Sequence, residues 1–189
     1  MITRRLTIEN WPDLVQVLGP SGGDKGCWCQ WWNWAPREYD ALTADARRDA
    51  LQAEVRSGQT VGIIGYSDDT PVGWCAVSPG WRSLPRRERS RAWRPPDDTE
   101  VWAITCFYIV ADQRGEGLAS ELLAGAEALA RSEGARWLEA YPRDCMGSRQ
   151  TDRAMYFGSL GMFLDAGFTE HTRRIPAFAI VRKELRALA

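Results

Sequence analysis

The stretch IVADQRGEGLASELL, residues 109–123, decides the fold. An apolar strand runs into a glycine-rich turn, and the turn opens an amphipathic helix. In such a turn, backbone N–H groups point at one spot, with the positive end of the helix dipole behind them. Gly115 and Gly117 lack a Cβ, so an anion such as a phosphate can come close to the backbone. The alternative interpretation is a tight strand-to-helix turn that needs glycine for its geometry alone.

Two familiar phosphate-binding motifs do not fit this turn. A Walker loop requires Gly-Lys-Ser/Thr, and no such sequence follows Gly117. A dinucleotide fingerprint requires three spaced glycines within an opening strand–helix–strand unit, and both features are missing. If the turn binds an anion, it does so as a site of another type.

The rest of the chain predicts a mixed arrangement of strands and helices. Residues 60–66 and 71–77 flank the turn-rich SDDT and indicate an antiparallel hairpin. Residues 100–110 are apolar on both faces, as in a central strand. Helices are expected at 11–19, 43–57, 116–134 and 159–167, and further strands at 3–11, 136–141, 168–174 and 177–185.

Residues 80–99 interrupt this arrangement with six arginines, three acids and three prolines. This composition favours an excursion or lid over a core element. Arg82, Arg86 or Arg87 would then lie near an anionic group of a ligand, such as a phosphate. The alternative is a solvated basic loop.

The pattern R-x-x-G-x-A is present as RGEGLA, residues 114–119, and resembles the signature of the GNAT superfamily of acyl-CoA-dependent N-acyltransferases. The order of predicted elements from residue 3 to 185 is similar to that superfamily, and MFLDAGF (162–168) resembles its last helix and following turn. The resemblance implies an α/β (α+β) GNAT fold, with a mixed, mostly antiparallel sheet of about six or seven strands. Helices would cover both faces, and the central strand pair would be splayed. One N-acetyltransferase domain would span residues 1–189.

The resemblance also implies how acetyl-CoA binds. Main-chain groups of the central strand would pair with the pantetheine arm, and the amides of residues 115–120 would hold the pyrophosphate. The residues expected to contact acetyl-CoA are Phe107, Tyr108, Ile109, Arg114, Gly115, Glu116, Gly117, Leu118, Ala119, Ser120, Tyr156 and Ser159. An amide in the slot between the splayed strands would polarise the thioester carbonyl.

The sequence departs from the superfamily at the expected proton donor. Many relatives have a tyrosine in the last helix that protonates the leaving thiolate, and the corresponding residue here is Phe163. Tyr156 is therefore a candidate to contact pantetheine or to act as the acid; otherwise it is an aromatic residue at the edge of the core. Glu139, an acid inside the apolar strand 136–141, is the candidate general base, unless it faces outward on a wet strand face.

The segment GCWCQWWNWAP, residues 26–36, holds four tryptophans and two cysteines. A structural zinc site needs a second pair of ligands, and a Cys-x-Cys spacing is not a redox motif, so we expect no metal. In the superfamily this region forms one wall of the acceptor slot. The residues expected to bind the acceptor amine are Trp28, Trp31, Trp32 and Arg82. Core packing is the alternative for each tryptophan.

Composition excludes several classes of protein. The chain has 189 residues, a formal net charge of −1 and 44% hydrophobic residues, which suits one domain with a sizeable core. Near-neutral charge gives no pull towards nucleic acid or membranes, and no apolar run approaches the roughly 20 residues that span a bilayer. Five scattered cysteines and an N-terminus without an apolar signal favour the reducing cytoplasm.

The sequence thus predicts a cytoplasmic N-acetyltransferase that transfers the acetyl group of acetyl-CoA to a primary amine of a small molecule or peptide by direct attack. Its partners would be acetyl-CoA and the amine, without nucleic acid, membrane or metal, and pairing through the late strands would give a homodimer. Two alternatives stay open. One is a catalytically silent acyl-CoA-binding regulatory protein, which Phe163 favours. The other is a nucleic-acid-binding protein that uses the arginine-rich excursion.

Overall fold

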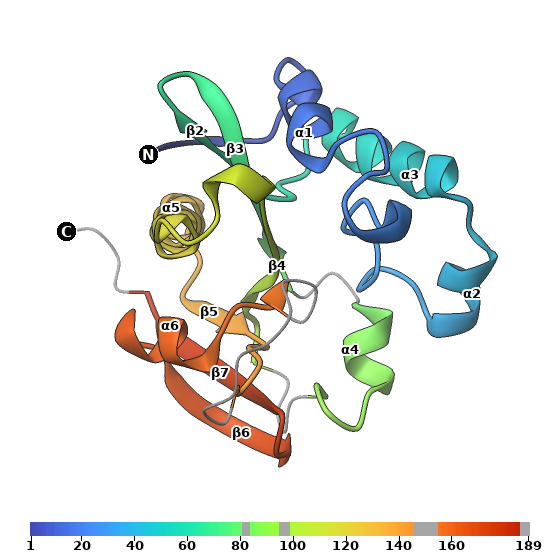
Figure 1. Ribbon diagram of the computed structural model, residues 1–189. Helices are drawn as coiled ribbons and strands as arrows, with labels where there is room; N and C mark the ends of the chain where they lie inside the picture. Colours follow the sequence, from blue (N-terminus) through green and yellow to red (C-terminus); the bar gives the residue numbers. More distant parts are fainter. Residues whose placement is uncertain (81–83, 95–98, 146–154, 186–189) are drawn as a thin grey trace.

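The computed structural model describes residues 1–80, 84–94, 99–145 and 155–185. Its centre is a seven-stranded sheet with the order β1-β2-β3-β4-β5-β7-β6 (Figure 1). The strands are β1 (Ile2–Arg5), β2 (Ile63–Ser67), β3 (Thr70–Pro79), β4 (Trp102–Ile109), β5 (Trp137–Ala140), β6 (Thr169–Ile175) and β7 (Phe178–Glu184). Neighbouring strands are antiparallel except β4 and β5, which are parallel. The predicted mixed, mostly antiparallel sheet is confirmed.

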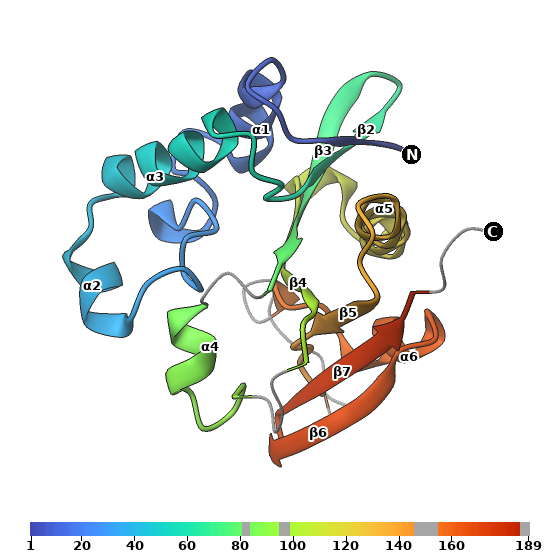
Figure 2. The same ribbon diagram turned by 180° about the vertical axis from the view of Figure 1, so that it is seen from behind.

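Helices cover both faces of the sheet. They are α1 (Trp11–Leu18), α2 (Pro36–Ala41), α3 (Ala44–Arg56), α4 (Pro85–Arg89), α5 (Leu118–Ser132) and α6 (Leu160–Asp165), with 3-10 turns η1 (Asp24–Gly26) and η2 (Ala111–Gln113). Figures 1 and 2 show α1 and α3 on one side of the sheet and α5 and α6 on the other. In the described part of the chain, no helix combines the length and the apolar character that crossing a membrane requires.

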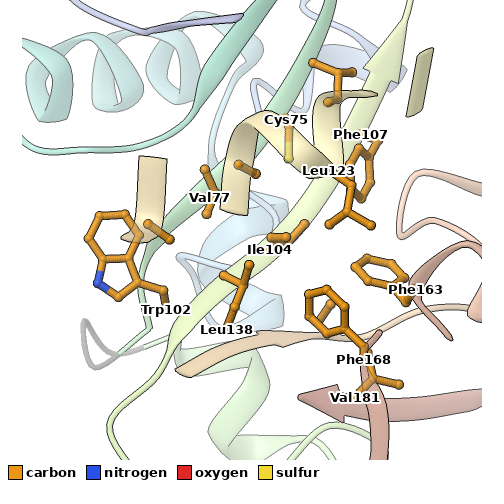
Figure 3. Packing of buried hydrophobic residues seen from close by; sticks show 14 of the residues in the cluster. Cys75, Val77, Trp102, Ile104, Phe107, Leu123, Leu138, Phe163, Phe168 and Val181 are labelled. Atoms are coloured by element: carbon orange, nitrogen blue, oxygen red, sulfur yellow. The ribbon is translucent and has the colours of Figure 1, made fainter. Parts of the chain in front are cut away.

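The face of the sheet under α5 and α6 carries the larger hydrophobic cluster. Leu123 of α5 packs with Ile104 and Phe107 of β4, and these side chains are at most 4% exposed. Figure 3 shows them in one cluster with Phe163 and Phe168. Burying a side chain of this size contributes about 1.5–3 kcal/mol. The cluster therefore fixes α5, and with it the glycine turn that precedes the helix.

The opposite face packs against α1 and α3. Leu14 of α1 and Leu51 of α3 contact a cluster that includes the completely buried Trp74 of β3. Cys106 and Tyr108 of β4 lie partly buried at the edge of this cluster. Alternate residues of β4 therefore point to opposite faces, as expected for a strand.

The central strand pair separates after a short parallel ladder. β4 and β5 pair only from Trp102 with Leu138 to Ile104 with Ala140, although β4 continues to Ile109. On its other edge, β4 has a bulge beside β3, because the register shifts between Ala76 and Val77. A bulge bends the strand and increases its twist. The predicted splaying of the central pair is therefore present, and it leaves one edge of residues 105–109 free of β5.

Local signals at helix ends explain two of the element boundaries. The helix expected at 43–57 starts where it was placed, because the Thr43 hydroxyl caps α3 by accepting a hydrogen bond from the Ala46 amide at 3.1 Å. The first strand was predicted at 3–11, yet β1 ends at Arg5. The chain turns there because the Asn10 side chain accepts from the Thr7 amide at 2.7 Å and donates to the Arg5 carbonyl at 3.0 Å.

The arginine-rich excursion is not simply a lid or a solvated loop. Its residues 85–89 form α4, which Figure 1 shows beside the lower half of the sheet. Leu84 and Ala92 are 5% and 8% exposed, and Arg87 is also buried. The prediction of an excursion or lid rather than a core element is therefore wrong for these residues. The high arginine content predicted a solvated segment. Arg87 is nevertheless buried, because it has an acidic partner on the sheet.

Candidate active site

The glycine turn before α5 has the geometry of an anion site. Gly115 and Gly117 have φ angles of 89° and 80°, in the left-handed region that favours glycine. Among the described residues, no atom lies within 4 Å of a Cβ added at either position. Gly117 is the N-cap of α5 and offers no side chain to the first amides of the helix. The turn therefore fits a phosphate group of a ligand better than a tightly packed connection.

A cavity of about 200 Å³ lies beside this turn, along the α5 and α6 side of β4. It is lined by Phe107, Ile109, Arg114, Ala119, Met155, Tyr156, Gly158, Ser159 and Met162. Six residues expected to contact acetyl-CoA lie together here: Phe107, Ile109, Arg114, Ala119, Tyr156 and Ser159. The remaining predicted contacts lie in the glycine turn and the start of α5, apart from Tyr108.

Two backbone groups on this edge of β4 already have partners. The Phe107 amide donates to the Tyr156 carbonyl at 2.7 Å, and the Arg114 guanidinium donates to the Ile109 carbonyl at 2.9 Å. A pantetheine arm that pairs with β4 has to use other groups or displace these contacts. β5 ends at Ala140, and the segment around Tyr156 lies beside part of β4 in its place.

A second cavity, of about 440 Å³, lies on the other side of β4. It is lined by Leu18, Gly22, Gly23, Asp24, Lys25, Cys27, Cys29, Trp31, Trp32, Tyr39, Arg47, Thr105, Cys106, Tyr108, Tyr156 and Phe157. We call it the aromatic cavity. Tyr156 lines both cavities, and its ring stacks on Tyr108 at a centroid distance of 6.0 Å. The two cavities therefore share Tyr156 in their walls, where β4 and β5 have separated.

The wall of the aromatic cavity is built from rings in mutual contact. Trp31 lies edge-on to Trp32 at 5.1 Å, and both contact Phe157. The Trp32 indole donates to the Thr105 carbonyl at 3.1 Å, which ties the wall to the bulge in β4. Arg86 of the excursion stacks on Trp31 at 4.1 Å and donates to its carbonyl at 2.6 Å. The structure places two of the predicted acceptor residues, Trp31 and Trp32, in this wall.

Trp28 does not line the aromatic cavity. Its ring is 4% exposed and stacks on Trp11 at 6.1 Å, so the predicted acceptor contact is replaced by core packing. The cause is a turn in which Trp28 and Cys29 both adopt left-handed φ angles, 47° and 53°. Each such residue costs about 1–2 kcal/mol. The other predicted acceptor residue, Arg82, lies outside the described residues.

Glu139 is completely buried in an ionic cluster. One carboxylate oxygen accepts from Arg87 at 2.7 Å and from the Tyr141 hydroxyl at 2.5 Å, and the other accepts from Arg182 at 2.7 Å. Glu139 lines neither cavity. The predicted role of general base does not fit this environment, because a base has to reach the acceptor. The alternative, an outward-facing acid on a wet face, is wrong.

The position where relatives have the proton-donating tyrosine lies in the core of this protein. Phe163 is completely buried and packs edge-on against Phe107 and Phe168. Tyr156 is half-buried between the two cavities, and burial raises its phenol pKa above the ordinary value. A raised pKa keeps the phenol protonated, which suits a proton donor.

Sequence analysis missed several residues of the aromatic cavity. Tyr39 comes from α2, Phe157 from the segment before α6, and Cys106 from β4. Because residues two apart in a strand lie on the same face, Cys106 could have been predicted to lie on the same face of β4 as Tyr108. The five cysteines are free thiols. Within the described ranges, no group of three or more His, Cys, Asp or Glu side chains is placed to hold a metal ion. The expected absence of a metal stays a prediction.

Solved structures with the same fold are known, although no curated protein matches this chain significantly. An N-acetyltransferase from Staphylococcus aureus Mu50 superposes with a TM-score of 0.54 at 14% identity, over 98% of both chains. PaiA N-acetyltransferase from Thermoplasma acidophilum, in complex with coenzyme A, gives 0.55 at 15% identity, over 97% of this chain and 98% of its own. Ribosomal-protein-alanine N-acetyltransferase from Brucella melitensis gives 0.55 at 17% identity, over 98% of this chain and 100% of its own. At these identities the likeness shows the fold alone.

The sequence itself decides the family. The family model described as the acetyltransferase (GNAT) family matches residues 28–159, which is more than half of the chain. The matched range contains β4, the glycine turn, α5 and residues of both cavities. The chain therefore belongs to the GNAT family of acetyltransferases and is an acyltransferase.

Proposed function

We propose that this protein transfers the acetyl group of acetyl-CoA to a primary amine of a small molecule or peptide, by direct attack of the amine. The observation that carries this proposal is that two cavities on opposite sides of β4 share Tyr156 in their lining, next to the part of β4 that β5 does not pair with. One cavity continues to an anion-binding turn, and the other has an aromatic wall. Two substrates that enter from opposite sides would have their reacting groups at this junction.

The smaller cavity fits coenzyme A. The amides around Gly117 and the positive end of the α5 dipole would hold the pyrophosphate, and Arg114 adds a cation beside Ile109. The cavity lining contains Met155, Met162 and Phe107, which suits the largely apolar pantetheine arm. Acetyl-CoA would supply an activated acyl group, and these residues bind and orient it.

The aromatic cavity fits the amine acceptor. An ammonium group is attracted to the faces of Trp and Tyr rings, and Trp31, Tyr39 and Tyr108 line this cavity. Asp24 adds a negative charge to the lining, whereas Lys25 and Arg47 add positive charges. The volume of about 440 Å³ accommodates a small molecule or the end of a peptide.

Tyr156 is the candidate proton donor in this scheme. It lies between the two cavities, next to the place where the thiolate would leave. Phe163 has no proton to give and is sealed in the core. The family's usual position is therefore not used, and we assign the acid role to Tyr156 from a different segment.

The alternative function is a silent acyl-CoA-binding regulator, favoured by Phe163. Purified protein incubated with acetyl-CoA and a panel of amines separates the two. Release of CoA thiol that depends on an added amine supports the transferase, with mass spectrometry of the amine as the direct readout. Tight CoA binding without amine-dependent thiol release would support the regulator instead. Cytoplasmic location and a homodimer also remain predictions.

A further inference from the structure

Three of the five cysteines line the aromatic cavity. Cys27 and Cys29 come from the tryptophan-rich segment, and Cys106 comes from β4 next to the bulge at Thr105. The proposed chemistry of an acetyltransferase does not by itself require a thiol on the acceptor side. These cysteines are therefore the feature of the cavity that the proposed function leaves unexplained.

The sulfur of Cys29 is a hydrogen-bond acceptor. The indole N–H of Trp74, a completely buried residue of β3, donates to it at 3.0 Å. The thiol of Cys106 on β4 lines the same cavity and donates to the Phe107 carbonyl at 3.7 Å. A donor aimed at the sulfur stabilises the thiolate relative to the thiol.

The surrounding groups favour the anionic form of the Cys29 thiol over the neutral form. The interaction with Cys106, helped by the hydrogen bond from Trp74, lowers the pKa of the Cys29 thiol despite its burial. Burial raises the pKa of Cys27, and the interaction with Cys29 raises that of Cys106 well above the ordinary value. Burial also raises the pKa of Cys75 on β3. Of these four cysteines, Cys29 is the one whose environment favours the anion.

Other charged or titratable side chains face the same space from every neighbouring element. The lining of the aromatic cavity adds Asp24, Lys25, Tyr39, Arg47, Tyr108 and Tyr156 to these cysteines. Behind the segment, Glu54 of α3 shares a smaller cavity with Cys29 and accepts from the Asn33 amide at 3.2 Å. Among the residues that the structure describes, Asp24 is therefore the one carboxylate in the lining of the aromatic cavity, and any experiment has to separate it from Cys29.

The backbone holds Cys29 in one place. Its left-handed φ of 53° follows that of Trp28, whose ring is fixed against Trp11. Non-glycine residues held in this region gather at functional sites, where surrounding packing maintains them. The turn sends Trp28 into the core and leaves Cys29 on the cavity wall.

We propose that the Cys29 sulfur is the general base that takes the proton from the acceptor ammonium. This inference rests on the proposed acetyltransferase function. The N–H bond of the ammonium breaks, an S–H bond forms on Cys29, and the freed lone pair attacks the thioester carbonyl. The amine nitrogen loses its second proton to solvent as the amide forms, and the leaving CoA thiolate gains one from Tyr156. Solvent then restores both side chains, so one proton is released per turnover.

The first experiment tests the thiolate without acetyl-CoA. Iodoacetamide labelling of the folded protein is followed by mass spectrometry at a series of pH values, and the rates at Cys29 and Cys27 are compared. We expect Cys29 to be alkylated at a lower pH than Cys27, and to lose this difference in Cys106→Ala and Trp74→Phe. Alkylation of the two thiols over the same pH range would overturn the proposal.

The second experiment tests the base role with an amine found by the activity panel. We expect Cys29→Ser to lower kcat/KM by about 10²-fold and to change the acidic limb of its pH profile, with CoA affinity unchanged. Cys145→Ser, outside both cavities, should keep the wild-type profile. A wild-type profile in Cys29→Ser, or a shift found only in Asp24→Asn, would overturn the role of Cys29. Absence of turnover by the wild type would overturn the proposed function and the base role with it, while the labelling result would still decide the thiolate.

Discussion

Arg87 on α4 and Glu139 on β5 form an ion pair of 2.7 Å in which the carboxylate is completely buried. The pair joins the arginine-rich excursion to the middle of the sheet. Arg182 on β7 completes the cluster from the other side. The excursion is thus held at one end by the Glu139 carboxylate, which is not exposed to solvent. Docking of the excursion on the sheet should therefore be sensitive to substitution of Arg87.

Arg87→Met should destabilise the protein strongly. Removing one partner leaves part of a buried charge uncompensated, which costs about 3–5 kcal/mol. The remaining Arg182 contact puts the expected loss near the lower end. Urea unfolding measures it, and Arg136→Met is the matched control. The side chains of Arg136 and Glu184 are 75% and 51% exposed, so that loss should stay below about 1 kcal/mol. Equal losses in both variants would contradict a buried ionic anchor.

Gly117→Asp should weaken CoA binding by at least about tenfold, or about 1.4 kcal/mol. A Cβ and a negative charge would stand where the pyrophosphate is expected. Calorimetry with CoA measures the change. Gly134→Asp is the matched control, because Gly134 has a φ of 82° and, among the described residues, no atom within 4 Å of an added Cβ. Both variants carry the same backbone strain, so unchanged CoA affinity in a folded Gly117→Asp variant would reject the assigned site.

Tyr156→Phe should lower kcat by about 10²-fold and change the KM for the amine much less. The phenol would lose its proton-donating group but keep its ring against Tyr108. Burial raises the pKa of Tyr156 above the ordinary value, so this acid ionises at a higher pH than a free tyrosine. Any loss of wild-type kcat from its ionisation should therefore also come at a higher pH than the ordinary tyrosine range. An unchanged kcat in the variant would assign proton donation to water.

Trp28→Ala should mainly lower stability, whereas Trp31→Ala should mainly weaken binding of the acceptor. Trp28 is a core ring, and its removal should cost about 3–5 kcal/mol of stability. Trp31 lines the aromatic cavity, so its removal should raise the KM for the acceptor, spare CoA binding and change the melting temperature less. Thermal unfolding and steady-state kinetics on the two variants decide this. Equal destabilisation without a KM change would move acceptor recognition away from Trp31.

The main features of the fold could be predicted because they depend on local periodicity. The turn from β4 into α5, the cap at Thr43 and the closing strands follow from short-range patterns. The docking of α4 could not be predicted, because it depends on Arg87 meeting Glu139 across 52 residues of sequence. Composition made the excursion look solvated, whereas a distant partner buries its charge.

The two sides of the candidate site also differ in how well the sequence predicts them. The proposed CoA side follows partly from a contiguous motif, and the structure brings six of the residues predicted for it around one cavity, including Tyr156 and Ser159 from outside the motif. The acceptor side is assembled from separate segments, so Tyr39, Phe157 and Cys106 left no linear pattern. Trp28 and Trp31 are three residues apart, yet the left-handed turn directs them to different environments. Side-chain direction in such a turn depends on φ angles that composition does not reveal.

The contact between Gly22 and Trp28 limits how this protein can be altered. A Cβ added at Gly22 would lie 2.1 Å from the Trp28 indole nitrogen, so position 22 tolerates a side chain only if residue 28 becomes smaller. A smaller residue there would in turn empty the stack on Trp11. The two positions are thus expected to change together or not at all during divergence. Engineering of acceptor preference would have to leave this pair intact and work through Trp31 and Phe157.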